Sequence, residues 1–396
     1  MRKTVLGKCL FFMLGVTPWL RAEVPENLPQ LEAKWNEVAL GGETSCSRGT
    51  PFSLFVYPGK INKVVIDYMG GGACWNAGNC APGSNKTFLE SIEEIKTEHK
   101  ELFEAGIYDH TNPENPFKDW HHVVVPYCTG DIHWGENDQT YTKRNKSFVI
   151  KHRGAVNSKA VLSWVQQHFK SPEKVLVTGY SAGAYGALYW YPHVVKMYPD
   201  SKVIQFADSG MSPITESFAK LAFKEWGVEK NRPSWIPGLD PAKVNWSKLQ
   251  VDYIYKQITD FYPQARMSAF TSAFDGTQRI FYALMDSDTP DDNIPDWPIL
   301  MKNMVESLGR ATPQFNYFLA PGHEHCLLPY ASFYTAKSAN GLFFKDWFKA
   351  YVEGGNTPNV PCSDCKDDSE SEMDSGMTNQ ALGFVSIRDE MMNVHY

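Results

Sequence analysis

The fold of this chain is decided by the stretch Lys174-Val-Leu-Val-Thr-Gly-Tyr-Ser-Ala-Gly-Ala-Tyr-Gly186. Its apolar run from Val175 to Thr178 predicts a buried parallel strand, and the residues from Ala184 to Trp190 favour a helix. Between them stands a G-x-S-x-G motif whose glycines allow strand and helix to approach closely while Ser181 adopts a strained backbone. An ordinary glycine-rich turn is the alternative. The flanks favour a nucleophile elbow that exposes Ser181 at the carboxyl end of a sheet.

Strands and helices alternate on both sides of this stretch. A helix with apolar residues at 3.6-residue spacing is expected at 156–169, directly before the elbow strand. Residues 211–262 interrupt the alternation with many aromatic residues and are expected to form helical insertions, either a partial cap or extra packing. The pattern predicts an α/β fold with a mostly parallel central sheet and helices on both faces. Its further strands are expected at 53–57, 63–68, 120–126, 202–207, 265–274 and 314–319.

Length and composition favour one large domain behind a targeting segment. The chain has 396 residues, of which 43% are hydrophobic, enough for a large packed core. Basic residues followed by an apolar run from Cys9 to Leu20 predict a signal peptide over 1–22, with an uncleaved anchor as the alternative. Residues 23–362 contain no Pro/Ser-rich linker and are expected to form a single catalytic domain. The acidic, polar segment 363–396 is expected to be a mobile tail.

The charge of the chain limits which partners it is expected to bind, and its cysteine content indicates the compartment in which it is expected to reside. The formal net charge is −7, and loss of residues 1–22 would remove four basic residues and no acid. This balance argues against nucleic acid or an anionic membrane as a partner, and no stable membrane span is expected after signal removal. In a secreted or periplasmic protein the seven remaining cysteines are expected to form disulfides, leaving one unpaired. The local candidates are Cys74 with Cys80 and Cys362 with Cys365; neither the second pair nor any other pattern has zinc-site spacing, so no metal is expected.

A serine nucleophile needs a base within hydrogen-bond reach and a carboxylate that orients the base. Asp275 follows the strand expected at 265–274, and His325 follows the strand expected at 314–319. Ser181, Asp275 and His325 therefore stand in the chain order serine, acid, histidine, each after a strand. This order predicts that the three side chains meet at one edge of the sheet.

Other residues compete for the roles of acid and base. Asp208 also ends a strand, but it is interpreted as a structural acid that accepts hydrogen bonds from loop amides. Asp286 and Asp288 are weaker alternatives for the acid, and His323 is an alternative to His325. The pair His121-His122 stands at the start of a strand, at the opposite edge, and is interpreted as structural.

An oxyanion hole requires amide groups aimed at the oxygen on which negative charge develops. One donor is expected from Ala182, directly after the nucleophile. The others are expected from Gly71, Gly72 or Ala73, in the glycine-rich loop after the strand at 63–68. A phosphate-binding loop is disfavoured because neither a Walker lysine nor G-x-G-x-x-G is present.

Aromatic and polar residues near these loops are candidates for a substrate cleft. Trp75 follows the glycine-rich loop, and Asp131 and Trp134 lie in the polar, aromatic loop after the strand at 120–126. All three are expected to face the cleft, although Trp134 has an equally plausible packing role.

At these residues the chain resembles the pectin acetylesterase and Notum family of serine carboxylester hydrolases. The matching pieces span roughly residues 40 to 350 and include Met69-Gly-Gly-Gly-Ala-Cys-Trp75, Val125-Pro-Tyr-Cys-Thr-Gly-Asp131, Gly179-Tyr-Ser-Ala-Gly-Ala-Tyr-Gly186, Ala207-Asp-Ser-Gly210, Phe274-Asp275 and His325-Cys326. The resemblance implies an α/β-hydrolase fold, a Ser181-Asp275-His325 triad and no metal or organic cofactor. It also implies that the oxyanion donors come from Ala182 and the glycine-rich loop.

The expected function is that of an exported serine esterase whose substrate is an acylated carbohydrate or another acyl ester. The resemblance favours removal of O-acetyl groups from a polysaccharide such as pectin. A Notum-like hydrolase of a longer acyl ester is the alternative, and it would need a deep apolar pocket beside Ser181. A catalytically silent carbohydrate-binding homologue and a peptidase are further alternatives; retention of all three triad residue types argues against the silent form.

Overall fold

A computed structural model describes residues 31–83, 87–98, 102–240, 242–285, 296–363 and 365. The expected signal peptide over 1–22 lies outside these residues. So do Asp286, Asp288 and residues 366–396 of the expected tail. The helices are α1 (Ile92–Glu98), α2 (Gly154–His168), α3 (Ala182–Met197), α4 (Glu216–Trp226), α5 (Val251–Phe261), α6 (Gly276–Met285), α7 (Trp297–Ala311) and α8 (Phe344–Glu353).

Eight strands form the central sheet in the order β1-β2-β4-β3-β7-β8-β9-β10. The six strands from β4 to β10 in this order run parallel, while β1 and β2 are added antiparallel at one edge. The mostly parallel sheet expected from the sequence is therefore confirmed. The strand bounds are β1 (Asn36–Ala39), β2 (Ser53–Tyr57), β3 (Lys63–Tyr68), β4 (His121–Val125), β7 (Lys174–Tyr180), β8 (Lys202–Asp208), β9 (Met267–Ser272) and β10 (Phe315–Ala320).

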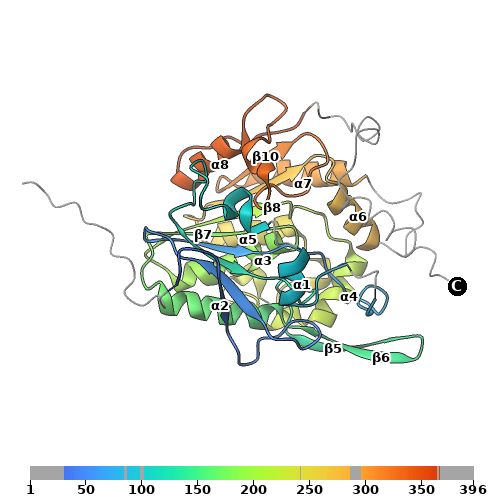
Figure 1. Ribbon diagram of the computed structural model, residues 1–396. Coiled ribbons are helices and arrows are strands. Elements are labelled where there is room, and N and C mark those ends of the chain that lie inside the picture. The colour runs from blue at the N-terminus through green and yellow to red at the C-terminus, as the bar shows by residue number, and fades with distance from the viewer. Residues whose placement is uncertain are drawn as a thin grey trace, which may run out of the picture.

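Helices cover both faces of the sheet (Figure 1). On one face lie α2, α3 and α5, and the Gln205 side chain of β8 donates to the Tyr255 hydroxyl of α5. On the other face lies α8, whose aromatic rings pack on Phe206, Phe270 and Phe318 of β8, β9 and β10. Because both faces are buried, the central strands read as continuous apolar runs, and β7 is buried along its whole length.

The aromatic segment 211–262 forms α4 and α5 with short 3-10 turns between them. Of its aromatic residues, Trp226 is fully buried and donates from Nε1 to the Cys74 carbonyl. Trp246 and Tyr255 are also buried, while Tyr253 is exposed. Most of the insertion therefore packs against the body of the protein.

Three elements were not expected from the sequence. A two-stranded hairpin, β5 (Asn137–Lys143) and β6 (Lys146–His152), extends from the body at the lower right of Figure 1. Its turn residues Arg144 and Asn145 both have positive φ. Glycine is the usual residue in this conformation, and because the turn contains none, the sequence carries no clear hairpin signal. The edge strand β1 is half-exposed and short, so it carries a weak apolar signal, and α7 follows a proline-rich stretch that obscures its start.

The cysteines pair as Cys46–Cys128, Cys74–Cys80 and Cys362–Cys365, leaving Cys326 free and buried. The two local pairs and the single odd thiol are as expected. The Cys46–Cys128 bond joins residues 82 apart in sequence, so no local pattern indicated it. It connects the segment before β2 with the loop that follows β4.

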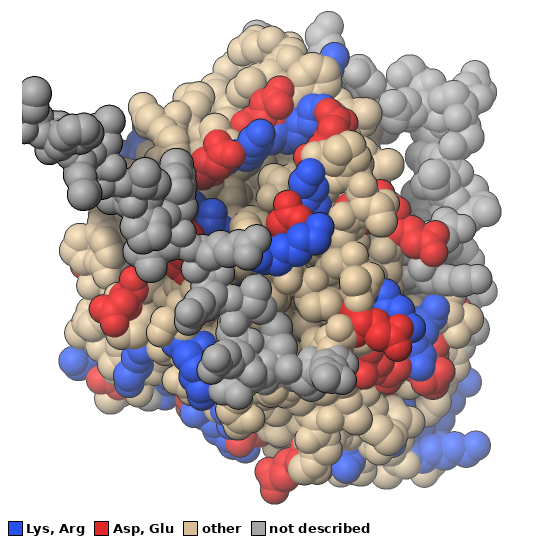
Figure 2. All heavy atoms as spheres, turned by 60° about the vertical axis from the view of Figure 1, so that its left-hand side comes forward, with Lys and Arg blue, Asp and Glu red and all other residues tan. Residues whose placement is uncertain are grey.

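The surface that Figure 2 shows carries Lys and Arg interspersed with Asp and Glu. No large area of a single sign stands out on this face. Ion pairs among the described residues include Lys345–Glu114 and Lys96–Glu37. None of the helices among the described residues has the length and apolar character that a bilayer crossing requires.

Replacing both cysteines of one disulfide by alanine is expected to destabilise the protein according to the loop that the bond closes. For the 82-residue separation of Cys46 and Cys128 the loss is expected to be about 4.5 kcal/mol, and for the 6-residue separation of Cys74 and Cys80 about 2 kcal/mol. The free energy of unfolding in guanidinium chloride measures both. An equal or larger loss for the Cys74–Cys80 pair would contradict the loop-closure account.

Candidate active site

Ser181 lies in the sharp turn between β7 and α3. Its φ is 53° and its ψ is −125°, so a non-glycine residue occupies the left-handed half of the backbone map. Such a conformation costs about 1–3 kcal/mol and persists only where the surroundings enforce it. The Ser181 amide donates to the Asp208 carbonyl oxygen at 2.8 Å, which fixes the turn to the neighbouring strand β8.

The glycines of G-x-S-x-G are required by close packing. A Cβ atom at Gly183 would lie 1.8 Å from the Tyr68 carbonyl oxygen at the end of β3. The first turn of α3 therefore presses directly on the neighbouring strand, and no larger residue fits there. The motif reflects a backbone contact that holds Ser181 at the carboxyl edge of the sheet.

Asp275 and His325 meet as the sequence predicted. Asp275 follows β9, and its fully buried carboxylate receives His325 Nδ1 at 2.8 Å (Oδ2) and 3.0 Å (Oδ1). Gln278 also donates two hydrogen bonds to this carboxylate, both at 2.9 Å. Its backbone N–H donates to Oδ1, and its side-chain Nε2 donates to Oδ2. With Nδ1 held by Asp275, the other ring nitrogen of His325, Nε2, is buried and has no partner among the described residues. His325 and Ser181 line the same cavity.

The pKa of His325 lies above its ordinary value of 6.5. Burial alone lowers this pKa, but the charge of Asp275, its hydrogen bond and the charge of Asp208 together outweigh burial. The surroundings therefore stabilise the imidazolium form, which is the form that a general base reaches after it has taken a proton.

The glycine-rich loop after β3 lies beside Ser181. Gly72 and Ala73 line the cavity together with Ala182, the first residue of α3, whereas Gly71 is not among the lining residues. Gly72 has φ 79°, and a Cβ there would lie 1.7 Å from the Thr87 carbonyl oxygen. No acceptor among the described residues takes the N–H groups of Gly71, Gly72, Ala73 or Ala182. These amides are therefore available for a ligand oxygen.

The rival acid and base take other partners. Asp208 is fully buried and accepts from the amides of Leu327 and Leu328, in agreement with its interpretation as a structural acid. His323 Nδ1 faces the Phe274 carbonyl oxygen at 3.0 Å, whereas the Nδ1 that bonds to the Asp275 carboxylate is that of His325. His122, near the start of β4, faces Asp67 of β3 at 3.1 Å, and both side chains are fully buried, which fits a structural role.

The cavity beside Ser181 has about 570 Å³ of space between protein atoms, part of which is open to solvent. Trp75 lines it, as expected, and packs edge-on against Phe218. The cavity is bounded mainly by the glycine-rich loop, the start of α3, α4 and α6. Its lining residues are Gly72, Ala73, Trp75, Ile132, Ser181, Ala182, Tyr185, Ser209, Ser212, Ile214, Phe218, Thr277, Gln278, Phe281, Met285 and His325.

Asp131 and Trp134 do not face the cavity, which corrects the expectation that they line a substrate cleft. Both are fully buried. Asp131 accepts hydrogen bonds from the Thr129 hydroxyl and from the amides of His133 and Gly154. Trp134 stacks on Tyr189 and donates from Nε1 to the Tyr185 carbonyl. Although Asp131 and Trp134 lie in a loop at the catalytic edge, their contacts stabilise the conformation of that loop.

Several cavity residues were missed by the sequence analysis. Gln278, Phe281 and Met285 lie on one face of α6, at spacings of three and four residues. Ile214 and Phe218 repeat the four-residue spacing at the start of α4. This helical spacing was readable in the sequence, but only the position of the helices shows that these faces turn toward Ser181.

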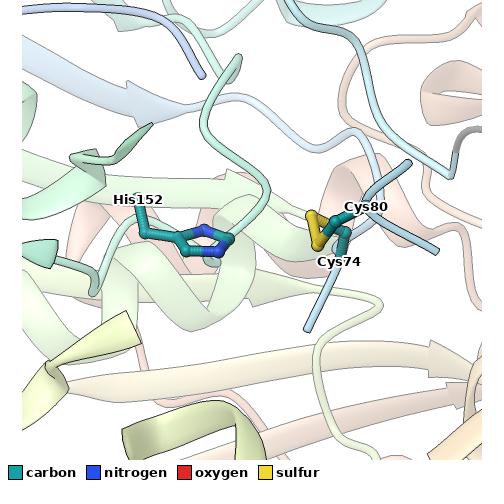
Figure 3. Close-up of side chains that lie close together, drawn as sticks. All are labelled: Cys74, Cys80 and His152. Atoms are coloured by element: carbon teal, nitrogen blue, oxygen red, sulfur yellow. A yellow bond between two sulfur atoms is a disulfide. The ribbon is translucent and has the colours of Figure 1, made fainter. Parts of the chain in front are cut away.

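One cluster among the described residues has the spacing of a metal site. Ligand atoms of Cys74, Cys80 and His152 lie within 4.8 Å of one another (Figure 3). The two sulfur atoms are bonded to each other, and both ring nitrogens of His152 have partners: the Thr129 carbonyl oxygen at 3.1 Å and the Tyr141 hydroxyl at 3.0 Å. The cluster is a disulfide next to a hydrogen-bonded histidine, and it has no free thiolate to offer a metal.

Fold and site together define an α/β-hydrolase. The parallel sheet carries Ser181 on a strand–turn–helix elbow, and the acid and histidine follow later strands in the order of that fold.

Comparison with known proteins agrees with this class. The family model described as pectinacetylesterase matches residues 37–218. A palmitoleoyl-protein carboxylesterase NOTUM from Schmidtea mediterranea is 28% identical over 148 residues, which cover 36% of this chain and 27% of that protein. The match thus spans about a quarter of the length of this curated relative. The solved structure of the Wnt deacylase Notum from Drosophila superposes with a TM-score of 0.60 and 15% identity, over 85% of this chain and 98% of that chain. These comparisons support the resemblance of the chain to the pectin acetylesterase and Notum family, with the family model matching a little under half of its residues.

The pH dependence of activity is expected to report the Asp275–His325 pair. Only neutral His325 accepts a proton, so kcat/KM on a soluble ester is expected to rise with pH through a midpoint above 6.5. Asp275→Asn removes the charge that raises this pKa, so the midpoint is expected to fall and kcat to drop roughly 10³–10⁴-fold. Asp67→Asn, which removes the carboxylate of the other buried Asp–His pair, serves as the matched control and is expected to leave the midpoint in place, because Asp67 is not among the groups that shift the pKa of His325. An unchanged midpoint in Asp275→Asn would contradict the assignment.

Proposed function

We propose that this protein is an exported serine carboxylesterase with Ser181 as nucleophile, His325 as general base and Asp275 as the carboxylate that orients the base. Ser181 Oγ attacks the ester carbonyl carbon while His325 Nε2 takes the hydroxyl proton. Amides of the glycine-rich loop and of Ala182 hold the oxyanion. The alcohol leaves with the proton from His325, and water, deprotonated by the same histidine, then releases the acid from Ser181.

One observation carries the proposal. The His325 ring has one nitrogen fixed by a buried carboxylate at 2.8 Å and the other nitrogen without a protein partner, in the cavity that Ser181 lines. His121 also has a buried Nε2 without a partner among the described residues, so what distinguishes His325 is the combination of that open nitrogen with the Asp275 carboxylate and the cavity of Ser181. The strained backbone of Ser181 supports the same role for the serine.

The lining of the cavity favours an acyl chain longer than acetyl. Aliphatic and aromatic side chains dominate the walls contributed by α4, α6 and the loop after β3, among them Trp75, Ile214, Phe218, Phe281 and Met285. An acetyl methyl group would contact only a small part of this surface, whereas a longer chain would bury much of it and gain roughly 0.8 kcal/mol per buried CH₂. The name of the planarian relative, a palmitoleoyl-protein carboxylesterase, points the same way.

Removal of O-acetyl groups from a polysaccharide is the second candidate. The matching family model is that of pectinacetylesterases, and it covers the segment from residue 37 to residue 218, which includes both the glycine-rich loop and Ser181. In this case the apolar cavity would receive part of the substrate other than the acetyl group.

Export is proposed on two grounds. The described residues contain three disulfides, which form and persist in oxidising compartments. The basic and apolar residues of segment 1–22 have the pattern of a signal peptide.

Hydrolysis of nitrophenyl acetate, octanoate and palmitate by the wild type and by Ser181→Ala tests the proposed reaction. The wild type is expected to cleave at least one ester, and Ser181→Ala is expected to lose at least about 10³-fold in kcat because no nucleophile remains. A fluorophosphonate probe is expected to label the wild type at Ser181 and not the variant. Activity that survives the substitution would refute the serine mechanism, and a preference for acetate would favour the polysaccharide acetylesterase.

A substitution that fills the cavity tests where the acyl chain binds. Ile214→Trp is expected to lower kcat/KM for octanoate at least tenfold and to leave kcat/KM for acetate within about threefold, because only the longer chain reaches this wall. The control is Leu221→Trp, an exposed position on α4 that does not line the cavity. Equal effects on both esters would show that the cavity does not hold the acyl chain.

A further inference from the structure

The dipeptide Asp208-Ser209 occupies the end of β8, between the two strands that lead to the nucleophile and the acid. Its neighbours in the sheet are β7, which leads into Ser181, and β9, which leads into Asp275. Asp208 is fully buried and Ser209 is 1% exposed. The dipeptide therefore lies at the bottom of the site, where Ser209 lines the cavity, in contact with the segments that carry the reacting groups.

Three consecutive backbone amides after His325 donate hydrogen bonds to the side chains of this dipeptide. Asp208 Oδ2 accepts from the amides of Leu327 at 2.8 Å and Leu328 at 2.7 Å. Ser209 Oγ accepts from the amide of Cys326 at 3.0 Å. The backbone directly after the base is thus fixed by two side chains from a different strand, about 120 residues earlier in the chain.

The backbone of the same dipeptide holds the nucleophile and the acid strand. The Asp208 carbonyl oxygen accepts from the Ser181 amide at 2.8 Å, and the Ser209 amide donates to the Phe270 carbonyl oxygen of β9 at 2.9 Å. Two residues therefore connect the nucleophile turn, the strand before Asp275 and the segment after His325.

Backbone strain accompanies these contacts. Ser209 has φ 56° and Cys326 has φ 71°, and both are non-glycine residues in the left-handed region. The two strained residues are joined by the hydrogen bond between the Cys326 amide and Ser209 Oγ. Strained conformations of this kind persist where several contacts enforce them, and they gather at sites whose geometry is tightly constrained.

We propose that Asp208 and Ser209 are positioning residues that fix His325 relative to Ser181, an inference that rests on the proposed serine mechanism. Neither residue transfers a proton in this scheme. Asp208 holds the base segment through two hydrogen bonds to one carboxylate oxygen, and Ser209 adds the third. A shift of about 1 Å in a catalytic group is enough to cost roughly 10²-fold in rate, so loss of these bonds is expected to appear in kcat.

The charge of Asp208 also affects the pKa of His325, and this effect can be measured separately from the positioning effect. The titratable groups that interact with it are His325, which favours its ionised form, Asp275, which opposes it, and the Cys326 thiol, whose pKa is raised by burial and by the charge of Asp208. Burial raises the pKa of Asp208 to about 7, although the amides of Leu328 and Leu327 lower it. In turn, the negative charge of Asp208 raises the pKa of His325, after the larger effects of burial and Asp275.

Asn and Ala substitutions at Asp208 distinguish the effect of its hydrogen bonds on the position of His325 from the effect of its negative charge. Asp208→Asn keeps one oxygen that accepts from both Leu327 and Leu328, so kcat is expected to stay within about tenfold of the wild type while the acid limb of kcat/KM moves to lower pH. Asp208→Ala removes both acceptor and charge and is expected to lose at least about 10²-fold in kcat with KM within about threefold. Ser209→Ala is expected to lose less than Asp208→Ala, since it removes one of three bonds.

Hydrogen exchange provides a readout that does not depend on activity. The amides of Leu327 and Leu328 are expected to exchange faster in Asp208→Ala than in Asp208→Asn, because only the Ala variant leaves them without an acceptor. Asp131→Ala is the matched control, because Asp131 is equally buried and accepts from the Gly154 and His133 amides in a different loop. It is expected to lower Tm without shifting the pH midpoint and to lose less than about tenfold in kcat.

The outcomes distinguish this inference from the proposed function. If Ser181→Ala remains active, the serine mechanism itself is wrong. If Ser181→Ala is inactive while Asp208→Ala stays within about threefold of the wild type in kcat, only the positioning role is refuted. An equal loss of kcat in Asp208→Ala and Asp131→Ala would also refute it, since the effect would then be general destabilisation.

Discussion

The contact between α3 and the end of β3 is the constraint on which the site depends. Gly183 meets the Tyr68 carbonyl so closely that no Cβ fits, and this contact forces the chain into a sharp turn at Ser181. The turn places the serine hydroxyl at the carboxyl edge of the sheet, and none of the described residues accepts a hydrogen bond from the first amide of the helix, that of Ala182. The same close packing brings the glycine-rich loop after β3 alongside. A backbone contact thus assembles a nucleophile and amide donors in one place.

Around this turn, buried carboxylates serve different purposes that their partners reveal. Asp275 receives a histidine whose other nitrogen is open to the cavity. Asp208 and Asp131 receive backbone amides, and they hold loops in place. Asp67 receives a histidine whose other nitrogen is engaged by His110 at 3.3 Å, deep in the core. Burial is common to all four, so the partner that each carboxylate takes, rather than its burial, indicates its role.

The cavity beside Ser181 is shaped by segments that the α/β alternation does not include. Its apolar wall comes from the start of α4, in the insertion between β8 and β9, and from α6, directly after Asp275. The sheet and the elbow can therefore be shared across a family while the walls decide which acyl group binds. The matched segment 37–218 contains the elbow and the glycine-rich loop but only the start of this wall, so the resemblance to the pectin acetylesterase and Notum family concerns the framework more than the choice of ester.

The sequence by itself determined the framework, because local patterns encode it. Consecutive apolar residues marked β3, β7 and β8, the glycines around Ser181 marked a close contact, and chain order indicated Asp275 and His325. Only the tertiary structure decided what each loop residue faces. Asp131 and Trp134 carry the chemistry of a cleft yet turn inward, whereas Phe281 and Met285 look like ordinary helix residues yet line the cavity. Two further contacts likewise join residues that are far apart in the chain. They are the Cys46–Cys128 disulfide and the hydrogen bonds from the amides after His325 to Asp208. Side-chain direction in a loop, and contacts across such distances, depend on how all the elements pack, and no local pattern of residues records that.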